Sequence, residues 1–205
     1  MIVEIDPLHP EPRKIARAVA ALEAGEVIAY PTDTVYAIGC DLHNRKAIDR
    51  MYQIKRMKSD QPLAFVCHDL SEIARWAIVE NAQYRLLRRL LPGPYTFILD
   101  ATREVPKVLL LKRKQVGIRV PAHPVPLALT EAFGRPIIST TASWHGQDAL
   151  VDPHEIATEF PGVDIVLDAG VGGIIPTTVV DLTGGGVTVL REGAGDPDLF
   201  HSGAL

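Results

Sequence analysis

The sequence predicts an α/β fold built on a mixed sheet, in a single domain that spans residues 1–205. Segments with helical and with strand periodicity alternate along the chain, which is typical of sheets covered by helices. Near the C-terminus, two β-branched stretches flank the glycines at 184–186 and predict an antiparallel hairpin. Hydrophobic residues make up 47% of the chain, which is enough to bury a core without disulfides or metals.

Helices and strands alternate from the N-terminus to residue 91. Residues 12–24 predict an amphipathic helix, because apolar side chains recur at i, i+3, i+4 and i+7 from Ile15 to Leu22, and Gly25 provides a stop. A strand at 26–30 then runs into a polar stretch, which we interpret as an elaborate strand-to-helix turn. The other predicted elements are helices at 45–56, 70–77 and 81–91 and a strand at 62–67.

The pattern continues beyond the Pro-Gly-Pro break at 92–94. The Pro-rich segment 120–126 indicates a rigid corner between a strand and a helix, and the glycine-rich segment 170–178 indicates a loop that crosses the molecule. The predicted elements are helices at 124–133 and 152–160 and strands at 95–101, 116–120, 136–142, 163–169, 177–183 and 187–193.

Two isolated cysteines indicate a reducing compartment. Cys40 and Cys67 lie in apolar stretches without a CxxC spacing or a paired histidine, so we interpret them as reduced core thiols. The N-terminus lacks the basic and apolar regions of a signal peptide, and no segment approaches the roughly 18 consecutive apolar residues of a membrane span. We therefore expect a cytoplasmic protein without a membrane partner.

The net charge of −4 conceals an uneven distribution. Residues 45–119 carry sixteen Lys or Arg against seven Asp or Glu, whereas the rest of the chain carries five against eighteen. Such a basic segment favours an anionic partner. The alternative is that these charges only solvate helix faces, as around Arg88 and Arg89.

Polar side chains gather where predicted strands end. Thr32, Asp33 and Thr34 follow one strand, and further hydroxyls end the strand at 136–142. Crevices outside strand ends are where open α/β sheets bind ligands, so these groups predict a cradle for phosphate and carboxylate. The alternative is that the hydroxyls only cap helices and turns. The other members of the predicted cradle are Lys55, Arg56, Lys58, Arg119, Ser139, Thr140, Thr141 and Ser143.

Conventional catalytic motifs are absent from the sequence. It has no Walker GxxxxGK[ST], no strand-linked GxGxxG, no GxSxG and no HExxH. The histidines are scattered singly, which is not the spacing of a zinc site, so no protein-held metal is expected. Chemistry that rests on positioning and electrostatics, without a protein nucleophile, remains open.

The chain resembles the YrdC family through segments that occur in order over residues 12–193: YPTDTVYAIGCD, IKRMKSDQPLAFV, LPGPYTFIL, GIRVP, STTASWHG, PTTVVDLT and VLREG. The resemblance implies a twisted open mixed sheet flanked by helices, with a concave basic cavity. It also implies a nucleotidyltransferase that makes threonylcarbamoyl-adenylate from L-threonine, bicarbonate and ATP with Mg²⁺, for the threonylcarbamoyladenosine modification of tRNA. Pyrophosphate is the second product. Family members have also been regarded as binders of double-stranded RNA.

The resemblance assigns roles to individual residues. Thr32 and Thr34 resemble the hydroxyls beside the threonine substrate, and Arg119 resembles the arginine that contacts its carboxylate. Lys55 resembles the first basic residue of the family's Lys-x-Arg pattern, and Arg191 resembles an arginine on the nucleotide side. The expected catalytic residues are Lys55, Arg56 and Thr141, and the expected substrate- and nucleotide-binding residues are Thr32, Thr34, Lys58, Arg119, Ser139, Ser143 and Arg191.

The chain departs from the family pattern at three places. Where the family has Lys-Gly-Arg, this chain has Lys-Arg-Met at 55–57, so the arginine comes one residue early. Thr141 and Ser143 stand where the family has Ser and Asn, and Val66 replaces a common histidine. Similar substitutions occur in the YciO branch of the family, which the chain resembles most.

Three functions are compatible with these residues. The first is the synthase, with AMP and ATP as ligands. The second is an RNA-binding protein without synthase activity, which would grip tRNA or double-stranded RNA by its phosphates. The third is a synthase or hydrolase of a different acyl-adenylate, since the departures at Met57, Val66 and Ser143 could remodel the pocket.

Overall fold

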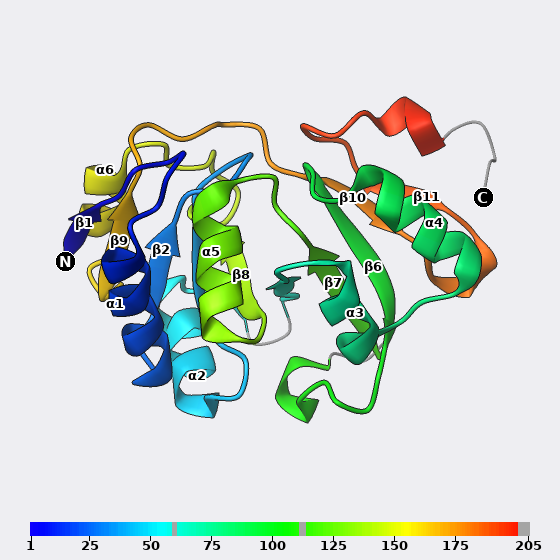
Figure 1. The fold of residues 1–205 in the computed structure, drawn as a ribbon, viewed down its shortest axis with the longest axis horizontal. Coiled ribbons are helices and arrows are strands. Elements are labelled where there is room, and N and C mark those ends of the chain that lie inside the picture. The colour runs from blue at the N-terminus through cyan, green and yellow to red at the C-terminus, as the bar shows by residue number, and fades with distance from the viewer. Residues whose placement is uncertain (59–60, 111–113, 201–205) are drawn as a thin grey trace.

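The computed structural model describes residues 1–58, 61–110 and 114–200 and confirms a mixed α/β fold (Figure 1). One sheet of 11 strands runs in the order β1-β9-β2-β3-β8-β4-β7-β6-β10-β11, and β5 pairs with β6 beside this path. The strands are β1 Ile2–Glu4, β2 Ile28–Tyr30, β3 Ala37–Asp41, β4 Ala64–Val66, β5 Ala77–Ile78, β6 Tyr95–Ala101, β7 Gln115–Arg119, β8 Ile137–Thr141, β9 Ile165–Asp168, β10 Thr178–Asp181 and β11 Thr188–Arg191. The α-helices are α1 Pro12–Glu23, α2 Arg45–Ile54, α3 Leu70–Trp76, α4 Asn81–Leu90, α5 Pro124–Phe133 and α6 Pro153–Glu159.

Strand alternation divides the core between the two faces of the sheet. In β9, Ile165 and Leu167 pack in one apolar cluster, whereas Val166 between them packs in the other. α1 and α5 lie side by side over the first of these faces (Figure 1), and α2 and α6 contribute to the second cluster. The two halves of the core therefore meet across the backbone of one continuous sheet.

Three strands, β1, β3 and β5, were not predicted from the sequence, and β3 changes the interpretation of the polar stretch after β2. β3 pairs antiparallel with β2, so residues 31–36 form a strand-to-strand connection, and the predicted strand-to-helix turn is wrong. β3 is buried along its whole length and shows no alternation that would identify it as a strand. Gly39 is needed there, because a Cβ would lie 2.9 Å from the carbonyl oxygen of Ile138 in β8.

The glycine-rich segment 170–177 links β9 to β10 as an irregular loop that crosses between the two halves of the sheet (Figure 1), as predicted. The C-terminal hairpin is also confirmed, since β10 and β11 pair antiparallel. β1, which was also not predicted, pairs parallel with β9 at the edge of the sheet. β5, the third unpredicted strand, begins at Ala77, where the sequence predicted the end of a helix. None of the helices in the described ranges is long and apolar enough to cross a membrane.

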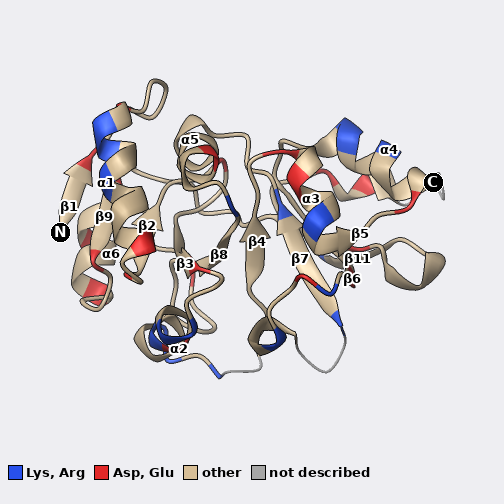
Figure 2. Cartoon of the chain, turned by 60° about the horizontal axis from the view of Figure 1, so that its bottom comes forward, with Lys and Arg blue, Asp and Glu red and all other residues tan. Residues whose placement is uncertain are grey.

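Lys and Arg are distributed over several elements of the described chain. Figure 2 shows them on α1 at one end of the molecule and on α3 and α4 at the other, with Asp and Glu among them. The basic segment of the sequence is thus spread over several elements. Within that segment, Arg88 and Arg89 lie on the last turn of α4, and Lys112 and Arg113 fall outside the described residues.

Candidate active site

A cavity of about 220 Å³ lies on one face of the sheet, over the strands between β3 and β10. β6 and β7 create it by alternation: Val116 and Ile118 of β7 pack in the core, whereas Gly117 and Arg119 line the cavity. Four predicted site residues line it together, namely Arg119, Ser139, Thr141 and Arg191. The rest of its wall is Val35, Ala37, Pro62, Leu63, Ala64, Val66, Thr96, Ile98, Gly117, Thr140, Thr177 and Val179.

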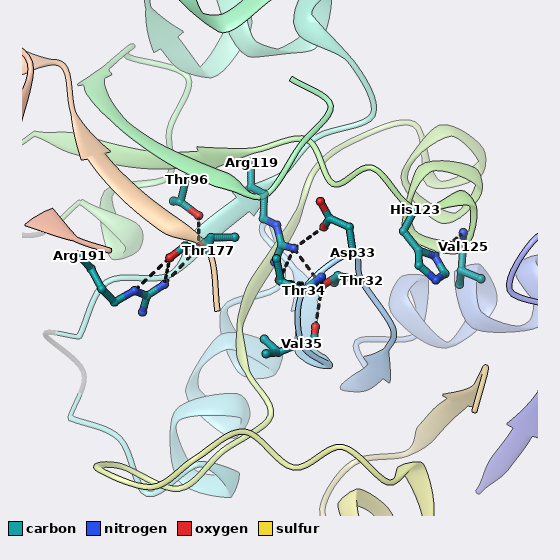
Figure 3. A network of polar contacts seen from close by, with 10 residues as sticks. All are labelled: Thr32, Asp33, Thr34, Val35, Thr96, Arg119, His123, Val125, Thr177 and Arg191. Atoms are coloured by element: carbon teal, nitrogen blue, oxygen red, sulfur yellow. Dashed lines mark hydrogen bonds and ion pairs between the residues drawn. The ribbon is translucent and has the colours of Figure 1, made fainter. Parts of the chain in front are cut away.

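The polar turn between β2 and β3 closes around the guanidinium of Arg119, the last residue of β7 (Figure 3). Its Nη2 lies 2.9 Å from Oγ1 of Thr32, 2.7 Å from Oγ1 of Thr34 and 2.6 Å from Oδ1 of Asp33. Thr32 donates its own hydroxyl to the carbonyl of Val35 at 2.6 Å, which fixes the turn. The structure therefore brings these four predicted polar residues to one point.

Two atoms of this cluster retain unused hydrogen-bonding capacity. Within the part of the chain that the structure describes, Oδ2 of Asp33 and Nε of Arg119 are buried without a hydrogen-bond partner. Buried polar atoms usually have partners, so orphaned ones indicate a ligand or water. A free carboxylate oxygen beside a free guanidinium N–H complements a small molecule that carries both an ammonium and a carboxylate.

Arg191 supplies a second guanidinium to the same cavity from the end of β11. Its Nη2 donates to the carbonyl oxygen of Thr177 at 2.8 Å and lies 3.1 Å from the Thr177 hydroxyl, which in turn lies 2.9 Å from that of Thr96 (Figure 3). Partial burial, and then the charge of Arg119, lower the pKa of Arg191. Two cations therefore line the cavity, and the carboxylate that pairs with Arg119, that of Asp33, is not among its lining residues. This balance favours an anion.

Lys55 does not line this cavity. It caps the C-terminus of α2, is 3% exposed, and donates through Nζ to the carbonyl oxygen of Thr141 at 2.7 Å and to that of Ser143. The ammonium also lies 5.0 Å from the ring centroid of Phe160. Because burial disfavours the charged form, the pKa of Lys55 falls to about 8. In this arrangement the side chain clamps α2 to the end of β8.

The other basic residues of the Lys-Arg-Met run and its flank lie apart from the cavity. Arg56 has a φ of 49°, in the left-handed region, and its guanidinium carbon lies 5.0 Å from the ring centroid of Trp144. Met57 and Ser143 line a neighbouring hollow of about 270 Å³. Lys58 is exposed and lines neither space. The predicted cradle is thus divided. Arg119 lines the cavity with Ser139, Thr140 and Thr141, whereas Lys55, Arg56, Lys58 and Ser143 do not join them.

Ser139 reaches the cavity from β8 and is held from behind by Tyr30. The two hydroxyl oxygens lie 2.5 Å apart in a buried contact. Burial raises the pKa of Tyr30 to about 12, so the phenol stays protonated at neutral pH and can serve as a donor to Ser139.

His123 caps the N-terminus of α5. Burial lowers its pKa, and its Nδ1 accepts from the backbone N–H of Val125 at 3.2 Å.

Sequence reasoning missed several residues that shape the site. Thr177 accepts hydrogen bonds from Arg191 and contacts the hydroxyl of Thr96, and the Trp144 ring lies under the guanidinium of Arg56. The signal for the two threonines was their place in otherwise apolar strand segments, where a hydroxyl needs a partner. Trp144 gave no comparable signal, because an isolated tryptophan in a loop has no periodicity.

Comparisons with known proteins agree on one family. The Sua5/YciO/YrdC family model, described as telomere recombination, matches residues 20–193. YciO of Escherichia coli (strain K12) is 42% identical over 199 residues, which cover 96% of this chain and 97% of that protein. Its crystal structure superimposes with a TM-score of 0.93 at 40% identity and covers 98% of both chains.

Two further relatives have names that describe an activity or a ligand. The threonylcarbamoyl-AMP synthase of Xanthomonas axonopodis pv. citri is 35% identical over 185 residues, covering 86% of this chain and 96% of that protein. The crystal structure of P. abyssi Sua5 complexed with L-threonine matches with a TM-score of 0.88 at 28% identity. That match covers 94% of this chain and 57% of the Sua5 chain.

Proposed function

Because this chain belongs to the Sua5/YciO/YrdC family, we propose that it is an ATP-dependent threonylcarbamoyl-AMP synthase that serves tRNA modification. Its substrates are L-threonine, bicarbonate and ATP, which brings Mg²⁺ with it. Its products are threonylcarbamoyl-adenylate, pyrophosphate and water. The observation that carries the proposal is that two guanidiniums, those of Arg119 and Arg191, line one cavity, and that Arg119 also pairs with Asp33.

The Arg119 end of the cavity suits a small amino acid. The free Nε of Arg119 can donate to a carboxylate, and the free Oδ2 of Asp33 can accept from an ammonium. Thr34 adds a hydroxyl at the same point, since its Oγ1 lies 2.7 Å from Arg119. The Xanthomonas relative named as a threonylcarbamoyl-AMP synthase supports threonine as this amino acid.

The reaction needs no protein nucleophile. The amine nitrogen of threonine bonds to the carbon of bicarbonate and water leaves, which forms a carbamate. A carbamate oxygen then attacks the α-phosphorus of ATP, and the bond from that phosphorus to the bridging oxygen breaks to release pyrophosphate. The work of the protein in this proposal is to position the reactants and to neutralise charge, and we assign the phosphates to Arg191, which lines the cavity.

The test is product formation by purified, nucleotide-free protein with millimolar ATP and Mg²⁺. Mass spectrometry should detect threonylcarbamoyl-adenylate, and pyrophosphate release should require both L-threonine and bicarbonate. An Arg119→Met variant that stays folded should lose both signals. Failure to form an adenylate with any amino acid would show the proposal to be wrong, and salt-sensitive RNA binding by such an inactive protein would support the RNA-binding alternative.

A further inference from the structure

The buried pair of Tyr30 and Ser139 lies where the apolar core meets the cavity. Tyr30, the last residue of β2, is 0% exposed and packs with Ala37 and Ile137 in the apolar cluster on the α1 and α5 face of the sheet. Ser139 comes two residues after Ile137 in β8, so its side chain lies on the same face, where it lines the cavity. The pair therefore joins the core to the wall of the cavity.

The neighbouring strands leave room for the Ser139 hydroxyl. Ser139 pairs with Gly39 of β3 on one side and with Ala64 of β4 on the other. A Cβ on Gly39 would lie 2.5 Å from Oγ of Ser139, so a side chain there would take the space that the hydroxyl occupies. Ala64 is small and also lines the cavity. The place of the hydroxyl is thus set by strand pairing and by its contact with Tyr30.

The direction of the hydrogen bond between the two hydroxyls follows from their surroundings. The oxygens of Tyr30 and Ser139 lie 2.5 Å apart, and within the described ranges no other hydrogen bond engages either side-chain hydroxyl. Burial raises the pKa of Tyr30 to about 12, so the phenol carries a proton. If Ser139 were the donor, that proton would be buried without an acceptor, which is unfavourable. Tyr30 is therefore the donor, and the proton of Ser139 stays free.

We propose that Tyr30 positions Ser139 as a hydrogen-bond donor to the carboxylate of the amino acid in the cavity. The proposal rests on the proposed function and adds a positioning residue to its amino-acid site. Ser139 is the binding residue in this account, and Tyr30 acts through it without touching the ligand. A serine whose oxygen already accepts one hydrogen bond presents its proton, which is complementary to an acceptor. The guanidiniums of Arg119 and Arg191 on the same cavity favour an anionic acceptor.

NMR of the ligand-free full chain tests where the shared proton resides. The protein is isotopically labelled at Cζ of tyrosine and at Cβ of serine. One slowly exchanging hydroxyl proton should couple to a tyrosine Cζ and should disappear in Tyr30→Phe, because the contact is buried. A slowly exchanging proton that couples instead to the Cβ of Ser139 would overturn the proposal. So would the absence of any slowly exchanging tyrosine hydroxyl proton that depends on Tyr30.

Calorimetry with L-threonine tests the effect of the pair on binding. Ser139→Ala should weaken the affinity about tenfold, since a hydrogen bond to a charged group is lost. Tyr30→Phe keeps the ring and the serine, and should weaken the affinity about two- to fivefold because the serine hydroxyl is no longer held in one orientation. In the Ser139→Ala background, Tyr30→Phe should cause no further loss, since both changes act through one hydrogen bond. Losses that add in full would contradict the proposal.

Tyr36→Phe is the matched control for the loss of a buried phenol hydroxyl. Tyr36 is also buried, but it packs in the other apolar cluster, and its hydroxyl donates to the carbonyl oxygen of Gly170 at 2.8 Å. Tyr30→Phe and Tyr36→Phe should both lower Tm, whereas only Tyr30→Phe should weaken L-threonine binding. Equal effects of the two variants on L-threonine affinity would show that Tyr30 contributes to stability alone.

Steady-state kinetics separate positioning from chemistry. Tyr30→Phe should raise KM for L-threonine by the factor by which the affinity falls, because the hydrogen bond forms with the bound substrate as well as in the transition state. The kcat and the KM for ATP should stay within about twofold of the wild type. A fall in kcat with an unchanged KM for L-threonine would contradict the binding role assigned to Ser139.

The outcomes distinguish this inference from the proposed function. If the wild type makes the adenylate but Tyr30→Phe binds L-threonine as tightly, the positioning role is wrong and the synthase stands. If L-threonine binding depends on Tyr30 and Ser139 as described but no adenylate forms, the positioning role stands and the synthase is wrong. Wild-type protein that binds no L-threonine would overturn the positioning role.

Discussion

Nη2 of Arg119 lies 2.6 Å from Oδ1 of Asp33, in an ion pair whose side chains are only 8% and 11% exposed. Asp33→Asn keeps the shape and leaves the guanidinium without its counter-charge. Breaking such a buried pair costs about 3 kcal/mol in the free energy of unfolding, which urea denaturation measures. Asp49→Asn is the control, because its pair with Arg45 is exposed and should cost less than about 1 kcal/mol. Equal losses of unfolding free energy in Asp33→Asn and Asp49→Asn would show that the Arg119–Asp33 pair does not stabilise the site.

Arg119 and Arg191 should differ in their effects on stability and on binding. Arg119→Met should lower the free energy of unfolding by about 3 kcal/mol, because Asp33 loses its partner. Arg191→Met should change it by only about 1 kcal/mol, because in the described chain this partly buried guanidinium contacts Thr177 and pairs with no carboxylate. Its ATP affinity should nevertheless fall about tenfold, as calorimetry can test. Unchanged ATP affinity in Arg191→Met would show that Arg191 does not contribute to ATP binding.

The stability of the protein should depend on the protonation of Lys55. The pKa of Lys55 is lowered by burial from 10.5 to about 8, so above pH 8 the folded chain loses a proton that the unfolded chain keeps. The free energy of unfolding should therefore increase with pH, from about pH 8 up to the pKa of lysine in the unfolded chain, about 10.4. Urea denaturation of wild type and Lys55→Met at pH 7.5, 8.5 and 9.5 measures it.

The expected result is that wild type gains stability relative to Lys55→Met as the pH rises. Lys46→Met, which removes an exposed lysine from the same helix, is the control for charge alone. A constant difference between wild type and Lys55→Met across this range would contradict the buried position of the ammonium.

The crossing loop should tolerate no side chain where it meets the β2–β3 turn. A Cβ on Gly173 would clash with the backbone carbonyl of Thr34, whereas a Cβ on Gly186 would meet nothing within 4 Å. Gly173→Ala should therefore cost about 1–3 kcal/mol of unfolding free energy and weaken L-threonine binding, because the turn around Arg119 must shift. Gly186→Ala should be neutral or slightly stabilising. Similar behaviour of the two variants in denaturation and calorimetry would show that the loop does not support the site.

Much of the fold was predictable, because most helices and strands carry a clear apolar period. The helix at 12–24 and the C-terminal hairpin are examples, and both are present. β3 was missed because a fully buried strand shows no alternation of apolar and polar residues. Without β3, the residues between β2 and β3 were wrongly predicted to form a strand-to-helix turn. The chain-long resemblance was a stronger guide to the family, which the comparisons confirm.

Only part of the site could be predicted from the sequence, because some of its residues lie on strands and others follow the end of a helix. Arg119, Ser139 and Thr141 lie at strand positions whose alternation carries them to the cavity, so strand-end reasoning found them. Lys55 and Arg56 follow the end of α2, where Lys55 keeps helical backbone angles and Arg56 turns into the left-handed region. That choice depends on Trp144, Phe160 and the carbonyls of β8, which are distant in sequence.

A co-crystal structure with L-threonine and a non-hydrolysable ATP analogue tests the central claim most directly. The account predicts that the threonine carboxylate contacts Arg119, that its ammonium contacts Oδ2 of Asp33, and that phosphates of the same complex contact Arg191. Both ligands bound elsewhere, or a cavity that stays closed around the Arg119–Asp33 pair at saturating ligand, would contradict it.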